Sequence, residues 1–263
     1  MVNCWVAYRF YKVTHKHHSI IALWATPRST STAFEWMMRQ RGDLNCLHEP
    51  FGEAWYQGEE PLWHRYQTGD KTTKGLTLES VWESILKMAE SGPVFMKDFP
   101  HYINHLWDKE FLSHFTHAFL IRDPALSVTS MYDKWPDFHD SEVGYPEQRA
   151  LFDLLHALNG KPPPVIDSSD VLEQPQEMVR AFCDSVSIPY MPEALTWEAG
   201  ADTSAYSWWD GGSFHQNLKT STGLVRQERK YVEIDKTPER VRQVYRRQLP
   251  HYQHLYKYRI GVG

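Results

Sequence analysis

The chain has 263 residues, of which 41% are hydrophobic, and its 28 lysines and arginines face 33 acidic residues for a formal net charge of −5. This length and apolar content allow one sizeable core, and the acidic balance argues against nucleic acid or an anionic membrane as a partner. Three cysteines without CxxC spacing (Cys4, Cys46 and Cys183) argue against a disulfide framework or a zinc ribbon and favour free thiols.

Residues 1–18 form an expected N-terminal extension. They mix basic and aromatic residues and so lack the unbroken apolar core of a signal peptide. No later run approaches the roughly 18 apolar residues that a membrane span requires. The sequence therefore predicts a cytoplasmic protein with no membrane partner.

Short apolar runs alternate along the chain with amphipathic stretches. The runs predict strands at 20–25, 45–48, 93–96, 117–121 and 165–166. The stretches predict helices at 31–41, 78–91, 125–132 and 175–186. Strands that alternate with helices indicate an α/β fold of three layers, in which helices flank a central parallel sheet. We expect one domain over residues 1–263, with 190–230 covering the active site.

The first candidate site follows the first predicted strand, in the turn Thr26-Pro27-Arg28-Ser29-Thr30-Ser31-Thr32. In such a sheet this turn commonly binds an anion through backbone N–H groups and the helix dipole, and Arg28 adds a positive charge. A Walker A loop would need Gly and Lys where the chain has Pro27, Ser31 and Thr32. The hydroxyl residues alone also fit a simple helix N-cap cluster.

A second motif, 120–130, has an arginine at the end of a strand and a serine eight residues later. Arg122 and Ser130 can thus reach one phosphate, although Arg122 could instead form a surface ion pair with Asp123. Together with 94–98, 165–175 and 221–223, these motifs resemble the sulfotransferases that use 3′-phosphoadenosine-5′-phosphosulfate (PAPS), over roughly residues 20 to 225.

The resemblance implies a P-loop-like fold, with PAPS as co-substrate, adenosine 3′,5′-bisphosphate (PAP) as product and no metal. It implies three groups of donor contacts. The 5′-phosphosulfate loop corresponds to Arg28, Ser29, Thr30, Ser31 and Thr32, the 3′-phosphate motif to Arg122 and Ser130, and the late loop to Ser221, Thr222 and Gly223.

The chain departs from the family pattern at two points. Thr30 stands where most members have Gly, so the loop must tolerate a Cβ there. The Lys-Thr-His signature that carries the catalytic histidine of steroid and phenol sulfotransferases is replaced by Lys97-Asp98-Phe99-Pro100-His101. The identity of the general base is therefore open.

Sulfuryl transfer needs alignment, positive charge and a proton acceptor. Arg28 is expected to bridge the 5′-phosphate and the sulfuryl group, and Lys97 to assist the departing oxygen. The candidate bases are Glu49, His101 and His48. Tyrosylprotein sulfotransferases resemble this chain in placing a glutamate after the second strand, which favours Glu49, although Glu49 could also be a structural partner of Arg28. A regular strand would point His48 and Glu49 to opposite faces.

The predicted function is transfer of a sulfuryl group from PAPS to a hydroxyl or amine of a small-molecule acceptor. A homodimer is left open, and no nucleic acid partner is expected. The alternatives are another nucleotide phosphotransferase, which would require magnesium ligands and a Walker lysine, and a nucleotide-binding module without activity.

Overall fold

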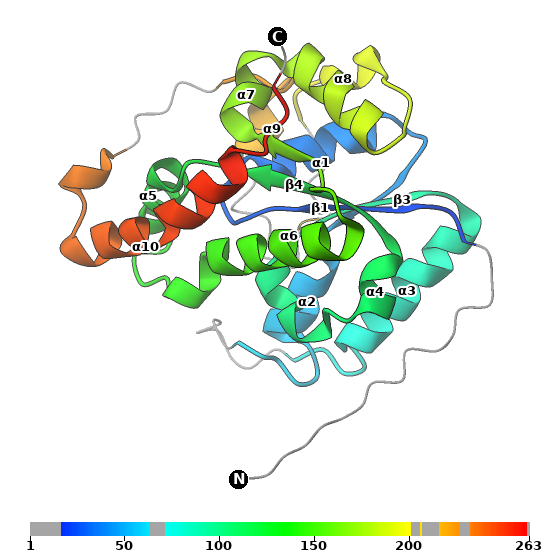
Figure 1. The fold of residues 1–263 in the computed structure, drawn as a ribbon, viewed down its shortest axis with the longest axis horizontal. Helices are drawn as coiled ribbons and strands as arrows, with labels where there is room; N and C mark the ends of the chain where they lie inside the picture. The colour runs from blue at the N-terminus through cyan, green and yellow to red at the C-terminus, as the bar shows by residue number, and fades with distance from the viewer. Residues whose placement is uncertain (1–16, 64–71, 201–205, 207–215, 227–231, 262–263) are drawn as a thin grey trace.

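The computed structural model describes residues 17–63, 72–200, 206, 216–226 and 232–261 (Figure 1). Its centre is a five-stranded sheet in the order β2-β3-β1-β4-β5, in which all neighbouring strands are parallel. The five predicted strands are confirmed: β1 Ile20–Trp24, β2 Asn45–His48, β3 Val94–Asp98, β4 Phe115–Ile121 and β5 Val165–Asp167.

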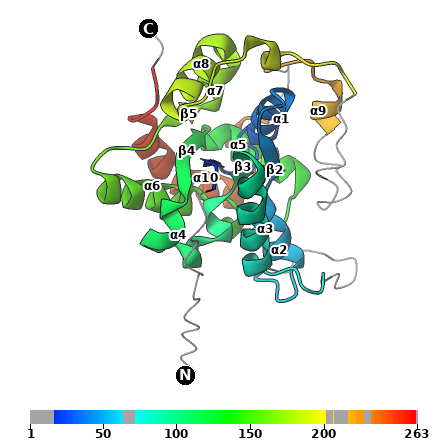
Figure 2. The same ribbon diagram turned by 90° about the vertical axis from the view of Figure 1, so that its right-hand side faces the viewer.

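The sheet is the centre of the hydrophobic core. All five residues of β1 and of β3 are buried, because both faces of a parallel sheet are covered by helices. Figures 1 and 2 show α1, α7 and α8 on one side of the sheet and α3, α4 and α6 on the other. The predicted three-layer α/β fold is therefore confirmed.

The four predicted helices are also present, as α1 Ser31–Gln40, α3 Leu78–Ser91, α5 Pro124–Lys134 and α8 Pro175–Ser185. The described residues contain six further helices that were not predicted: α2 Pro50–Gln57, α4 Lys109–Ser113, α6 Tyr145–Asn159, α7 Ser168–Glu173, α9 Gln216–Thr220 and α10 Glu239–Tyr256. The segment that directly follows β5 forms the short helix α7.

Helix α10 has too few apolar residues to be predicted from the apolar pattern of the sequence. It is rich in arginine and contains Pro250, and its buried residues form only a narrow stripe, which includes Val241, Val244 and Leu255. The helix packs against α5 and α6 rather than forming a wide core face. None of the described helices is long and apolar enough to cross a membrane.

The carboxyl ends of the strands meet at one edge of the sheet. The register pairs Trp24 of β1 with Asp98 of β3, and His48 of β2 with Lys97. The segments that follow the strands therefore converge, although they are far apart in the sequence. This edge is where ligands bind in open α/β sheets.

Candidate active site

A cavity of about 620 Å³ lies at this edge. Each strand contributes to its wall through the segment that follows its carboxyl end. Examples, one from the segment after each strand and given in sequence order, are Arg28, Glu49, Phe99, Arg122 and Ser168. The cavity therefore collects the first motif, the second motif and one candidate base from separate parts of the sequence.

The loop between β1 and α1 has an unusual backbone. Arg28 and Thr30 have φ angles of 63° and 70°, in the left-handed region that non-glycine residues rarely adopt. Thr30 therefore occupies a position suited to glycine, which is the residue found there in most sulfotransferases. Positive-φ residues of this kind cluster at binding sites, where the surrounding structure compensates their strain.

The N-cap alternative for this loop receives no support from the geometry. Thr30 is the N-cap residue of α1, and among the described residues its side chain makes no capping hydrogen bond. Ser29, Ser31 and Thr32 instead line the cavity. The hydroxyl-rich loop therefore faces the space that a ligand would occupy.

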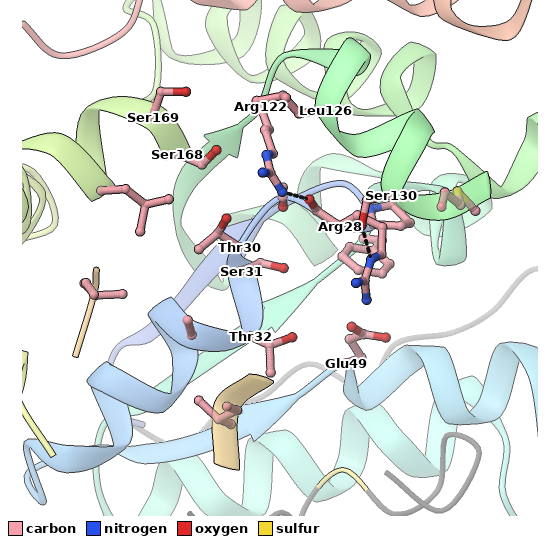
Figure 3. A pocket seen from close by; sticks show the side chains of 18 of the residues that line it. Arg28, Thr30, Ser31, Thr32, Glu49, Arg122, Leu126, Ser130, Ser168 and Ser169 are labelled. Carbon is pink, nitrogen blue, oxygen red and sulfur yellow. Dashed lines mark hydrogen bonds between the residues drawn. The ribbon is translucent and has the colours of Figure 1, made fainter. Parts of the chain in front are cut away.

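Arg122 and Ser130 hold this loop from the other motif (Figure 3). The Arg122 guanidinium donates a hydrogen bond of 2.6 Å to the Arg28 carbonyl oxygen, and the Arg28 Nε donates one of 3.1 Å to the Ser130 hydroxyl. Asp123, the next residue, accepts a hydrogen bond from the Ala125 backbone N–H and caps α5. The two predicted phosphate motifs thus form one connected unit.

Two buried hydroxyls on the cavity wall remain without a hydrogen-bond partner in the described part of the chain. These are the Oγ atoms of Ser29 and Ser168, whose residues are at most 1% exposed. Buried polar groups are nearly always satisfied. Both residues belong to the cavity lining, so a ligand with oxygen or nitrogen acceptors can supply the missing partners.

The late loop, residues 221–223, also contributes to the cavity wall. Ser221 and Gly223 line the cavity, and the Ser221 hydroxyl accepts a hydrogen bond of 3.1 Å from the Trp197 indole. Thr222 is exposed and does not belong to the described lining, although its carbonyl accepts a bond from the Trp197 backbone. Trp208 and Trp209 belong to the segment expected to cover the active site, and they lie outside the described residues.

Glu49 lies where β2 meets α2. The strand ends at His48, and Glu49 takes a left-handed φ of 47° before Pro50 starts the helix. Its carboxylate forms an ion pair with the Lys97 ammonium, and its side chain is 12% exposed. In Figure 3 the Arg28 side chain points toward Glu49, so a positive group and a carboxylate face each other across the cavity.

Lys97 is completely buried and is not among the described residues that line the cavity. Its ammonium also lies 4.7 Å from the centroid of the Phe99 ring. The structure therefore places Lys97 behind Glu49 rather than at the transferring group. Contact with a departing oxygen would require Glu49 to move aside.

The expectation that His48 and Glu49 face opposite sides is wrong. The His48 Nε2 lies 3.5 Å from the Glu49 Oε1. The alternation of a regular strand does not extend to Glu49, because its left-handed φ turns the side chain back toward His48. The two candidate bases are therefore neighbours.

His101 lies outside the described cavity lining. It is buried in an aromatic cluster, with ring centroids 4.5 Å from Tyr102 and 5.6 Å from Trp55. Gly144 packs so closely that a Cβ there would lie 2.4 Å from the His101 Nδ1. Burial lowers the pKa of the His101 imidazole to about 3, so this ring is a poor proton acceptor near neutral pH.

Asp98 lies at the end of β3, near the side of the cavity that holds Glu49, which is called the acid side below. Its carboxyl accepts hydrogen bonds of 2.9 and 2.8 Å from the backbone N–H groups of Phe51 and Phe99. Complete burial raises the pKa of Asp98 to about 8, opposed by these hydrogen bonds, and the neighbouring Glu49 raises it further. Asp98 thus links the end of β3 to the first turn of α2. Glu49 is the N-cap residue of this helix, so the link helps to fix its position.

Two residues of the wall, Glu142 and Ser168, were not among the site residues expected from the sequence. Tyr56 and Glu142 line the cavity near Tyr102, and the Tyr56 hydroxyl donates a hydrogen bond of 3.3 Å to the Glu142 Oε1. Glu142 comes from a short turn with no recognisable pattern. Ser168 could have been found, because it directly follows a predicted strand end.

Among the described residues, no group of three or more histidines, cysteines or acids is placed to hold a metal ion. Cys46 and Cys183 are free thiols, and Cys4 lies outside the described residues. The polar groups of the cavity are instead arginines, hydroxyls and carboxylates. Their chemistry suits an anionic ligand at one end and proton transfer at the other.

A family model described as the sulfotransferase domain matches residues 19–257. Two Arabidopsis thaliana proteins also match. The Branched-chain-amino-acid aminotransferase-like protein 2 is 28% identical over 219 residues, and protein 1 of the same name is 26% identical over 223 residues. Both matches cover 78% of this chain and 36% of the relative, so the chain spans about a third of their length.

Two solved structures are also similar. The sulfotransferase domain from the Synechococcus PCC 7002 olefin synthase has a TM-score of 0.46 and 15% identity, covering 95% of this chain and 99% of that one. The sulfotransferase domain from the curacin biosynthetic pathway has a TM-score of 0.46 and 13% identity, covering 89% and 98%.

Proposed function

The chain belongs to the sulfotransferase domain family, and from that premise we propose that it transfers a sulfuryl group from PAPS to a hydroxyl or amine of a small-molecule acceptor. The observation that carries this proposal is the link between the two phosphate motifs. Arg122 donates to the Arg28 carbonyl and Arg28 donates to Ser130, so both motifs face one cavity. A donor with phosphate groups at both its 5′ and 3′ ends would engage both.

The 5′ end of the donor would bind at the loop that precedes α1. The left-handed residues Arg28 and Thr30 orient the backbone around the N-terminus of this helix, where N–H groups attract anions. The buried Ser29 hydroxyl adds a hydrogen-bond donor. Arg122, which is only 8% exposed, would contact the 3′-phosphate together with Ser130.

The reaction would be an in-line displacement at sulfur. The acceptor oxygen or nitrogen forms a bond to sulfur while the bond from sulfur to the bridging oxygen breaks, and the electron pair leaves with the 5′-phosphate. Arg28 would stabilise the charge that develops on the transferring and departing oxygens. Glu49 would take the acceptor proton, since it is the one candidate base in the described cavity wall.

Donor binding provides the direct test. PAP at about 100 times its dissociation constant should raise the free energy of unfolding by about 2.7 kcal/mol, whereas ATP with magnesium should have little effect. Differential scanning fluorimetry measures the shift. Arg122→Ala should reduce the PAP response, and Arg149→Ala on the outer helix α6 is the matched control. Equal responses to PAP and ATP, or none to either, would remove the proposal.

A further inference from the structure

A line of charged side chains runs from the cavity into the core behind Glu49. The first link is the Lys97 to Glu49 ion pair, in which the lysine is fully buried. In the described part of the chain, Glu49 is the only carboxylate paired with this ammonium. If Glu49 kept a proton taken from the acceptor, a buried ammonium would lose its compensating charge, which costs several kcal/mol.

His48 is the second link. Its Nε2 lies 3.5 Å from the Glu49 Oε1 and its Nδ1 lies 3.8 Å from the Glu35 Oε2. The imidazole therefore stands between two carboxylates. Both separations are longer than a hydrogen bond, and catalytic contacts of this kind commonly shorten when substrate binds.

Glu35 is the third link, and it is held in place from two sides. It is 0% exposed on α1, where the Arg39 Nε donates to its Oε1 at 2.9 Å. The Tyr206 hydroxyl donates to its Oε2 at 2.5 Å, and the Tyr206 ring packs edge-on to His48 with centroids 4.2 Å apart. Tyr206 is itself completely buried.

We propose that Glu35 and Tyr206 are positioning residues of a buried relay, in which His48 takes from Glu49 the proton that the acceptor releases. The inference rests on the proposed function. The acceptor O–H or N–H bond breaks, its proton passes through a Glu49 oxygen, and an N–H bond forms at the His48 Nε2. Glu35 stabilises the resulting imidazolium through the Nδ1–H.

The charge balance favours this path. With His48 neutral, Glu35 and Glu49 are matched by Arg39 and Lys97. The arriving proton then gives the cluster a single positive charge beside an anionic donor. Burial raises the pKa of Glu35, and Arg39, the Tyr206 hydroxyl and Lys97 partly oppose this rise. Cys46 also faces this cluster from β2, and burial raises the pKa of its thiol to about 12, which keeps it neutral.

Histidine-selective nitrogen NMR tests the relay without depending on turnover. The His48 signals are assigned by their loss in His48→Gln. Glu35→Gln should lower the pKa of His48 by about 1 to 3 units, because it removes a carboxylate charge close to the ring. Tyr206→Phe should lower it by less. Tyr252→Phe, which removes a similar hydroxyl-to-carboxylate bond at Asp167, should leave it unchanged.

A second measurement follows sulfate release from PAPS in single turnover, with water as the acceptor. Glu35→Gln should slow release about tenfold and Tyr206→Phe by less, while stabilisation by PAP stays at the wild-type level. Tyr206→Phe removes one oxygen atom, so it keeps the test available if Glu35→Gln does not fold.

Two results overturn the relay alone: an unchanged His48 pKa in both variants, or a wild-type His48 that takes up no proton down to the acid limit of folding. In either case, sulfate release and the PAP response would leave the proposed function intact. A wild-type protein that neither responds to PAP nor releases sulfate would instead remove the proposed function, and the relay with it.

Discussion

The side of the cavity where the sulfuryl donor is proposed to bind contains Arg28 and Arg122 and is called the donor side here. Its arginines contact backbone and hydroxyl groups, as in the hydrogen bonds from Arg122 to Arg28 and from Arg28 to Ser130. On the acid side, each charge is met by an opposite charge within the protein, as in the Lys97 to Glu49 and Arg39 to Glu35 pairs. The two pairs on the acid side balance their charges without a ligand. The proposed function places the anionic co-substrate at the arginines of the other side.

The largest effect should come from disturbing that internal balance. Glu49→Gln should lower turnover by about 10²-fold or more, because the proton acceptor is lost. It should also lower the free energy of unfolding by about 3 kcal/mol, because the buried Lys97 ammonium loses its carboxylate. Single-turnover sulfate release and urea denaturation measure the two quantities.

A double variant separates these two losses. Adding Lys97→Met to Glu49→Gln removes both charges, so stability should recover while turnover does not. Recovery of turnover would show that Glu49 only balances Lys97. If His101→Gln loses most of its turnover while Glu49→Gln keeps normal kinetics, the general base is His101 rather than Glu49.

On the donor side, Arg122→Ala should chiefly weaken binding. Loss of a charge-assisted contact to phosphate costs about 1.5 to 3 kcal/mol, which corresponds to a roughly 10- to 150-fold rise in the PAP dissociation constant. Isothermal titration calorimetry measures it, with Arg149→Ala as control. A fall in turnover at saturating PAPS, without any change in affinity, would contradict the assignment.

The buried Asp98 predicts a dependence of stability on pH. Its pKa is about 8 in the folded protein, above the ordinary value of 3.8, so the folded state binds the extra proton between these values. The contribution of Asp98 to stability is therefore fully present below about pH 4 and is lost as the pH rises through 8. Wild type should lose at least about 1 kcal/mol more than Asp98→Asn between pH 5 and pH 8 in urea denaturation. Parallel profiles would show that Asp98 is ionised throughout.

The smallest effect, a change in the free energy of unfolding, is expected from a substitution in the loop between β1 and α1. Thr30→Gly relieves a left-handed φ of 70° but also gives the unfolded chain more freedom, so it should raise the free energy of unfolding by less than about 1 kcal/mol. Thr32→Gly, inside α1, should lower it. Thermal denaturation compares the two. A clear loss in Thr30→Gly would show that the Thr30 side chain stabilises the loop.

The sequence by itself determined the sheet and the position of the first two motifs at one edge of it. Short apolar runs predict buried strands, and residues directly after a strand must lie at its carboxyl end, so the positions of Arg28, Arg122 and Glu49 at one edge follow from local pattern. Helices with few apolar residues, such as α10, were missed because the apolar period that identifies a helix is weak in them.

Only the tertiary structure decided the acid side. His101 lies four residues after Lys97, yet the turn after β3 directs it into an aromatic cluster, while Glu49 turns back to His48 through a left-handed backbone. Tyr206 reaches Glu35 across 171 residues of sequence. Burial and charge pairing depend on which elements pack together, and those contacts carry no local signature in the chain.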